Sequence, residues 1–421
     1  MNLLVKNGRI IDPARKLDVN ADILILEGKI RSIGKALKAD VQQFDASGLI
    51  VAPGFFDIHV HLREPGTEEA ETIATGGSAA VAGGFVAVAA MPNTKPPNDN
   101  PSITSYIVAE ARRSSPAMVF PIGAISKEQK GETLAEIGEM VEAGIAGISD
   151  DGKPVMDARL FRRALEYSQL FDLPVIQHCE DLHLSKGGVM HEGATSSRLG
   201  LKGMPSAAED TMVSRDLILA ELTGGKYHVA HLSTRRAVEM VRAAKARGLK
   251  ISAEVTPHHF TLTDDAVAEY DTNAKMNPPL RSKDDVDALV EGIADGTIDA
   301  IASDHAPHHI NLKMLEFDRA PFGITGLETA VGLAMTQLRL PLTKLIEMFS
   351  LNPQRIMRVE PWGIFEGSDA NITVLDSSRV WKFDVNRSRS RSRNSPFHGW
   401  DMKGKAVGTI VRGKVVYEDR T

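Results

Sequence analysis

Eight short apolar runs recur through the middle of the chain, and longer stretches of mixed polarity separate most of them. The runs occupy residues 55–62, 85–92, 118–125, 144–150, 174–180, 227–233, 250–259 and 299–307. Their nearly continuous apolar character predicts parallel strands that are covered on both faces. Helix-like segments such as 208–224 and 233–248 lie between them. Repeated strand–helix units of this kind predict an α/β fold, a (β/α)8 TIM-like barrel.

An open, doubly wound sheet is the alternative arrangement for the same pattern. Such a sheet would carry a glycine-rich phosphate-binding turn after its first strand. The chain instead continues as "HLREPG" after its first apolar run. We therefore expect the barrel.

Both ends of the chain differ from the middle, because they are rich in β-branched residues bounded by turn sequences. The strand-like segments are 2–11, 21–34 and 48–53 at the start, and 370–376 and 406–419 at the end. The simplest account is one small β-sandwich domain that both termini build. We expect it to comprise residues 1–53 and 365–421, with the barrel domain inserted as residues 54–364.

Composition limits the classes of function. The 421 residues are 43% hydrophobic and 25% charged, with a formal net charge of −6, which does not favour a nucleic-acid partner. The single cysteine, Cys179, excludes an intramolecular disulfide framework. The sequence also lacks an apolar run long enough to cross a bilayer and a signal-peptide pattern at its start. We expect a cytoplasmic protein.

Polar residues at the ends of the apolar runs carry the candidate chemistry. They are His59, His61, Asp151, His178, His231 and Asp304. In a barrel these ends meet at one face, where active sites are built. Histidine nitrogens and carboxylates without thiolates suit Zn²⁺ or a similar metal. Since six groups exceed one tetrahedral site, we predict two ions that share a carboxylate and support hydrolysis.

Arg63 follows the first two histidines at the same spacing of two residues. On a strand, alternate residues share a face, so His59, His61 and Arg63 are expected to point the same way. A guanidinium beside a metal site can bind a carboxylate through two hydrogen bonds. This pattern predicts that the shared face binds a metal, an anion, or both.

The motifs together resemble one family. "DIHVHLREPG", "MPNT", "DDGKP", "VAHLST", "MNPPLR", "SDHAPH" and "APFGITG" are similar to the dihydroorotases of the amidohydrolase superfamily, in their longer bacterial form, over nearly the whole chain. The resemblance implies reversible hydrolysis of (S)-dihydroorotate to N-carbamoyl-L-aspartate in pyrimidine (UMP) synthesis. A hydroxide between two Zn²⁺ ions would attack the ring amide, and Asp304 would act as general base and then acid.

The resemblance also assigns residues. The first metal would take His59, His61 and Asp304, Asp151 would bridge, and His178 and His231 would hold the second. Substrate contacts would come from His61, Arg63, Asn93, Asn277, His308 and the backbone of Phe322 and Gly323. Between the adjacent His308 and His309, only the motif favours the first. A homodimer and a complex with aspartate transcarbamoylase are the implied partners, with no nucleic acid and no membrane.

Several alternatives stay open at this point. Asp150 competes with Asp151 for the bridge, and Lys153 would serve as a carboxylated lysine. A dihydropyrimidinase, hydantoinase or allantoinase would share the barrel but typically carries that lysine. A non-catalytic scaffold beside aspartate transcarbamoylase is the third alternative, although such chains usually lose ligands. The adjacent His258 and His259 are interpreted as partners that orient the ligands by hydrogen bonds.

Two segments outside the motifs also carry expectations. Residues 307–321 form a long loop at the predicted barrel mouth and are hypothesised to close over bound substrate; limited proteolysis with and without ligand tests this. Residues 386–394, "NRSRSRSRN", are interpreted as a solvated basic loop. A nucleic-acid contact is the alternative, but no aromatic residues interleave with the arginines.

Overall fold

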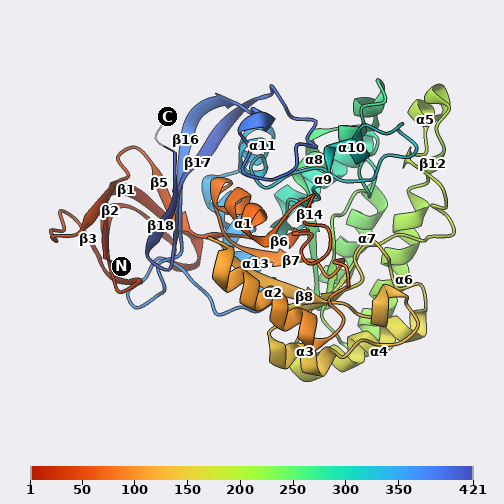
Figure 1. Cartoon of the computed structure of the whole chain (residues 1–421), viewed down its shortest axis with the longest axis horizontal. Helices are drawn as coiled ribbons and strands as arrows, with labels where there is room; N and C mark the ends of the chain where they lie inside the picture. The colour runs from red at the N-terminus through yellow and green to blue at the C-terminus, as the bar shows by residue number, and fades with distance from the viewer. Residues whose placement is uncertain (1, 420–421) are drawn as a thin grey trace.

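The computed structural model describes residues 2–419, and its centre is the predicted barrel (Figure 1). Its strands are β6 (Phe55–Val60), β7 (Phe85–Ala90), β8 (Met118–Gly123), β9 (Gly147–Ser149), β10 (Val175–Gln177), β13 (Tyr227–Val229), β14 (Ile251–Val255) and β15 (Ala300–Ile301). They pair in chain order. A bridge between Val60 and His305 brings the first strand to the end of the eighth. Each of the eight predicted runs therefore supplies one strand.

Helices follow the strands and cover the outside of the barrel. The longer ones are α1 (Ile73–Ala82), α2 (Pro101–Ser114), α3 (Ile137–Ala143), α4 (Ala158–Ser168), α6 (Ala207–Thr223), α7 (Arg235–Ala246), α9 (Lys283–Asp295) and α11 (Ala330–Gln337). In α7, the Thr234 side chain accepts the backbone N–H of Ala237 at 3.2 Å and so caps the first turn. Val238, Val241 and Ala244 are buried, at the spacing of one helix face. This face packs the helix on the barrel.

Shorter elements lie in the loops at the barrel mouth and after the last strand. They are α5 (Ala194–Leu199), α8 (Pro257–Thr261), α10 (Ile310–Lys313), α12 (Leu342–Ile346), α13 (Asn352–Met357) and the paired strands β11 (Met190–His191) and β12 (Gly203–Met204). Within residues 2–419, no helix has the length and apolar character that crossing a membrane requires.

The two ends of the chain build a second sheet, beside the barrel in Figure 1. Its strands are β1 (Leu3–Asp12), β2 (Leu17–Leu26), β3 (Lys29–Gly34), β4 (Gln42–Asp45), β5 (Ile50–Pro53), β16 (Ile372–Lys382), β17 (Asp401–Val411) and β18 (Lys414–Glu418). Strand β16 pairs antiparallel with β5, so the C-terminal strands extend the N-terminal ones. The expected β domain from both termini is thus present as one hydrogen-bonded sheet.

Buried hydroxyl groups join this sheet to the barrel. The Thr373 hydroxyl accepts the N–H of Phe55 at 3.0 Å and donates to the carbonyl of Gly84 at 2.6 Å. The Thr409 hydroxyl donates to the carbonyl of Val81 at 2.7 Å. Since these carbonyls lie at the end of α1 and the start of β7, the terminal sheet is fixed against the first strand–helix unit.

Candidate active site

The six predicted ligands converge at the carboxyl ends of the barrel strands. His59 lies in β6, and the others follow the ends of β6, β9, β10, β13 and β15. The ligand atoms form two groups, and within each group all of them lie within 4.8 Å of one another. One group is His59, His61 and Asp151, and the other is Asp151, His178 and His231. Asp151 belongs to both groups, which is the arrangement that a shared carboxylate requires. The Asp304 carboxylate lies 3.1 Å from Nε2 of His61.

Buried hydrogen bonds orient the first two histidines. Nδ1 of His59 lies 2.6 Å from Oε1 of Glu254. Burial opposes ionisation of Glu254, but the neighbouring His59 and His228 outweigh it and lower the pKa of Glu254 to about 2. Because a carboxylate only accepts hydrogen bonds, His59 carries its proton on Nδ1 and turns Nε2 toward Asp151. His61 likewise directs Nδ1 at Oδ1 of Asn93, 2.8 Å away.

A carboxylate holds His178 in the same manner. Nε2 of His178 lies 2.9 Å from the Glu180 carboxylate, so its Nδ1 is free to offer a lone pair. That Nδ1 lies 2.9 Å from Nε2 of His231 and 3.8 Å from Oδ1 of Asp151. Nε2 of His231 lies 3.6 Å from the same oxygen, so two imidazole nitrogens and a carboxylate oxygen face one point.

Unsatisfied atoms mark the same place. Nε2 of His59 and Oδ1 of Asp151 are buried without a hydrogen-bond partner and lie 3.3 Å apart. Buried polar groups normally have partners, so such atoms require an explanation. Lone pairs gathered at one centre, with His59, His61 and His178 each fixed from behind by a hydrogen bond, match a cation site. The residues present fit a metal site.

A cavity of about 290 Å³ opens beside these groups. It is lined by His61, Arg63, Asn93, Asp151, Gly152, His178, His231, Asn277, Asp304, Ala306, His308, Pro321, Phe322 and Gly323. All the residues expected to contact substrate thus meet the expected ligands in one cavity; of the ligands, only His59 lies behind its surface.

Arg63 reaches the cavity in a manner that strand alternation did not predict. Strand β6 ends at Val60, and Arg63 has a left-handed backbone with φ of 61°. The expectation that it shares a strand face with the histidines is therefore wrong, although its side chain lies in the predicted cavity. Its Nε donates to the carbonyl of Pro307 at 3.1 Å. Burial lowers the pKa of Arg63 to about 10, so the group stays cationic at neutral pH.

His308 lies beside this guanidinium, with Nε2 at 3.5 Å from Nη2 of Arg63. Burial, reinforced by the Arg63 charge, lowers the pKa of His308 to about 2, so the ring is neutral. Its Nε2 is 2.7 Å from the carbonyl oxygen of Phe322. A carbonyl oxygen only accepts, so Nε2 carries the proton. The motif-based choice of His308 over His309 agrees with this geometry, since His309 lies at the start of α10.

The competing bridge candidates are not placed for that role. Asp150 accepts the N–H groups of Ile125 and Ser126 at 2.9 and 3.1 Å and is thereby turned into the loop after β8. Lys153 is exposed. Asp151 is the acidic residue that faces the histidines.

The carboxylates behind the ligands are the functional residues that sequence reasoning missed. Glu254 lies in β14 and Glu180 follows β10, and a strand-end acidic residue two positions from His178 was the available signal. Among the described residues, no hydrogen bond joins His258 or His259 to a predicted ligand; His259 bonds Thr256 and the Pro278 carbonyl instead. Asn277 donates to Glu180 at 2.7 Å, which ties a cavity wall to this carboxylate.

Comparisons with known proteins agree with the geometry. A family model described as Dihydro-orotase-like matches residues 48–237. A dihydroorotase of Solibacter usitatus is 54% identical over 98% of this chain and 97% of its own length. A dihydroorotase of Geobacter metallireducens is 52% identical over 99% of this chain and all of its own length.

Solved structures share the architecture. An L-hydantoinase (dihydropyrimidinase) from Arthrobacter aurescens is 25% identical with a TM-score of 0.88, covering 99% of this chain and 96% of its own. A D-hydantoinase (dihydropyrimidinase) from Thermus sp. is 27% identical with a TM-score of 0.83, covering 99% and 95%. Full-length identity near one half sets the dihydroorotases apart from these. The chain belongs to the dihydroorotase family of metal-dependent cyclic amidohydrolases.

Proposed function

We infer that this chain catalyses the dihydroorotase reaction, the reversible hydrolysis of dihydroorotate to N-carbamoyl-L-aspartate in pyrimidine synthesis, and we propose how its residues do so. The observation that carries the proposal is one cavity that unites a buried histidine–aspartate cluster with a guanidinium. The cluster suits hydrolysis of an amide, and the guanidinium suits a substrate that bears a carboxylate.

We propose two Zn²⁺ ions in the cluster. His59, His61 and Asp304 would hold the first, His178 and His231 the second, and Asp151 both. The support is the two overlapping ligand groups and their unsatisfied atoms. When bound, such ions polarise the scissile carbonyl and lower the pKa of water. Glu254 and Glu180 would keep His59 and His178 in the tautomers that leave the inward nitrogen free.

We propose that Asp304 moves the proton. Burial opposes its ionisation, but His61, His59 and His231 outweigh it and hold the pKa of Asp304 well below its usual range, so the group is a carboxylate that can accept. It would take a proton from the attacking water and return it to the leaving ring nitrogen. Because Asp304 lines the cavity, one group can serve in both directions of the reaction.

Substrate orientation is assigned to the other residues that line the cavity. Arg63, Asn93 and His308 would bind the ring carboxylate, and Asn277 with the backbone of Phe322 and Gly323 would contact the ring. The guanidinium supplies the charge, while neutral His308 adds no second positive charge. An uncharged ring would leave the Arg63 charge without its anion, which favours dihydroorotate over a dihydropyrimidine or a hydantoin.

The Arg63→Met variant tests this assignment. It should raise KM for dihydroorotate about tenfold to a hundredfold, the usual worth of a charge-assisted pair, and should change KM for uncharged dihydrouracil by about threefold or less. Arg112→Met, at the exposed end of α2, is the matched control and should behave as the wild type. Equal losses on both rings would show that Arg63 does not bind the carboxylate.

Metal content tests the proposed bridge without relying on activity. Zinc-loaded wild-type protein should retain two ions per chain after gel filtration, as the two ligand groups imply. Asp151→Asn should retain fewer, since an amide is a weak ligand for both ions. Asp150→Asn is the matched neighbour and should keep the wild-type content. One ion per chain in all three proteins would contradict the two-ion proposal.

The homodimer, the transcarbamoylase complex and the cytoplasmic location stay predictions.

A further inference from the structure

The Arg/Ser segment, residues 386–394, is not a uniformly solvated loop. Ser390, Ser392 and Asn394 are buried, with exposed fractions of 1%, 5% and 1%. Arg387, Arg389 and Arg391 between and before them are exposed. The interpretation as a solvated basic loop therefore holds for those arginines only. The alternating sequence gives the segment a buried polar face and a charged outer face.

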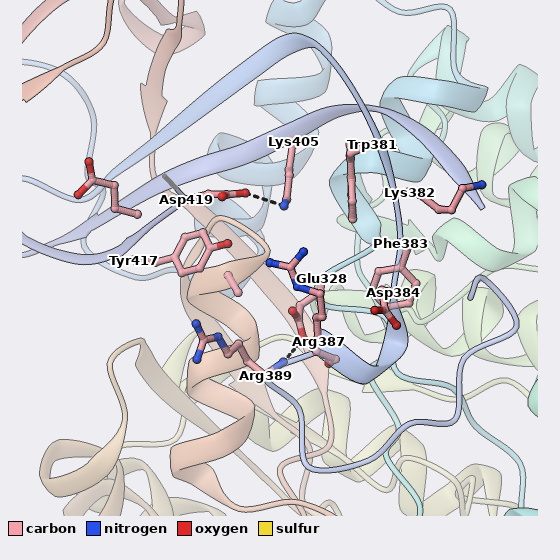
Figure 2. A pocket seen from close by; sticks show the side chains of 13 residues that line it. Glu328, Trp381, Lys382, Phe383, Asp384, Arg387, Arg389, Lys405, Tyr417 and Asp419 are labelled. Carbon is pink, nitrogen blue, oxygen red and sulfur yellow. Dashed lines mark hydrogen bonds and ion pairs between the residues drawn. The ribbon is translucent and has the colours of Figure 1, made fainter. Parts of the chain in front are cut away.

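Two carboxylates of the barrel, buried Glu71 and half-buried Glu328, hold the buried face. The Ser388 hydroxyl and the N–H of Arg389 both donate to Glu328. Figure 2 shows Glu328 next to the segment, with the Arg389 side chain extending away from it into the wall of a pocket that Tyr417 also lines. Further along, the Ser390 hydroxyl and the N–H of Arg391 donate to Glu71. These contacts fix the path of the segment toward the barrel mouth.

Asn394, at the end of this path, bridges two loops of the barrel. Its Nδ2 donates to the carbonyls of Ala306 and Gly323, each at 3.0 Å. Its Oδ1 accepts the backbone N–H of His308 at 3.0 Å. Its own carbonyl accepts the N–H of Thr325 at 2.8 Å. One side chain thus satisfies three backbone groups that come from two neighbouring loops of the cavity.

The bridged loops are the proposed substrate walls. His308 and Gly323 line the active-site cavity, and Asn394 does not. The Nε2 of His308 also donates to Phe322, so the two loops meet at the cavity and, behind it, at Asn394. A bond from the Ala306 N–H to the Ile324 carbonyl at 2.7 Å also joins the loops, so removing the Asn394 amide would loosen the walls at His308 and Gly323 while leaving every cavity side chain in place.

We propose that Asn394 is a positioning residue for substrate binding, through which the C-terminal β segment sets the spacing of the His308 and Phe322–Gly323 walls. The inference rests on the proposed contacts of these walls with dihydroorotate. The Arg/Ser segment then acts in the reaction by holding these walls. This role differs from nucleic-acid binding and from that of a solvated loop.

Kinetics of Asn394→Ala test the proposal. KM for dihydroorotate should rise about tenfold, because three backbone groups lose their partner and the walls lose their spacing, while kcat should fall about threefold or less. Asn386→Ala, at the exposed start of the same segment, is the control and should match the wild type. A residue with a merely structural role would lower the folded fraction and hence apparent kcat, with KM unchanged; that result would overturn the proposal.

Asn394→Asp is the second variant. It keeps the side-chain volume and the acceptor for the His308 N–H, but it removes both donors and places an anion against two carbonyls. KM should rise at least as much as in Asn394→Ala, and an unchanged KM would overturn the proposal. Arg63→Met in the same assay separates the two claims. If Arg63→Met raises KM and neither Asn394 variant does, the positioning inference fails alone. If Arg63→Met and both Asn394 variants leave KM unchanged, the proposed substrate walls fail.

Discussion

At the residue scale, a partner behind the ring sets the inward nitrogen of His59, His61 and His178. Glu254 at 2.6 Å from His59 and Glu180 at 2.9 Å from His178 decide which nitrogen keeps its proton. Such partners matter because a ligand in the wrong tautomer offers a proton where the metal needs a lone pair. Glu254 lies far from His59 in the sequence, so a motif that contains only the histidine does not reveal this partner.

The sequence predicted which residues gather at the barrel mouth better than the means by which they reach it. Runs that end in histidine or aspartate placed His178, His231 and Asp304 at one face of a barrel, and the structure brings them together. Alternation on a strand was the wrong reason for Arg63, since a left-handed turn directs its side chain. A local period describes regular strands, and it says nothing about the turns that follow them.

Asp304→Asn tests the proposed proton carrier. The amide cannot accept and return a proton, so kcat should fall by at least about a hundredfold, while the circular dichroism spectrum should match the wild type. Asp401→Asn is the control, because Asp401 is exposed in β17 and pairs with exposed Lys382. Turnover of Asp304→Asn close to the wild-type rate would assign proton transfer to another group.

At the element scale, the strand–helix alternation was readable because buried parallel strands and amphipathic helices have different periods. The long expected helices 208–224 and 233–248 correspond to α6 and α7. The Arg/Ser segment was misread because its composition suggests solvation, whereas its alternation places serines on Glu71 and Glu328. Those carboxylates lie more than fifty residues away in the sequence, so no local sequence pattern predicts their contacts with the serines.

The segment 307–321 is tied down by buried lysines. Nζ of Lys275 donates to the carbonyls of Phe317 and Ala320, each at 2.6 Å. Nζ of Lys313 donates to the carbonyl of Pro321 at 2.9 Å. Burial lowers the pKa of Lys275 to about 8 and that of Lys313 to about 7. The Lys275 contacts hold the segment against the loop that carries Asn277, and the Lys313 contact joins the two halves of the segment itself.

Limited trypsin digestion tests whether this segment is a lid. Exposed Arg319 should be cut in the free protein, and N-carbamoyl-L-aspartate at ten times its Kd should slow that cut roughly tenfold if only the open form is cleaved. Cleavage after exposed Lys38 in the terminal sheet is the internal control and should not change. Identical cleavage after Arg319 with and without ligand would reject the lid.

At the scale of the whole molecule, the two chain ends form one sheet that is fixed to the barrel through Thr373 and Thr409. The domain boundaries at residues 53/54 and 364/365 stay predictions. Strand β5 of the terminal sheet ends at Pro53, and β6 of the barrel begins at Phe55. Composition alone indicated that both ends belong together, because both are β-rich. Only the structure shows how the C-terminal segment contacts the active-site loops, because Asn394 bonds the carbonyls of Ala306 and Gly323.

The measurement that tests the central claim most directly is ring opening of dihydroorotate, dihydrouracil and allantoin by the zinc-loaded protein, side by side. A cavity that joins a hydrolytic metal site to the Arg63 guanidinium predicts that kcat/KM for dihydroorotate exceeds that for either uncharged ring by about tenfold to a hundredfold or more. Faster opening of dihydrouracil or allantoin would contradict the account and place the chain's activity with the hydantoinases.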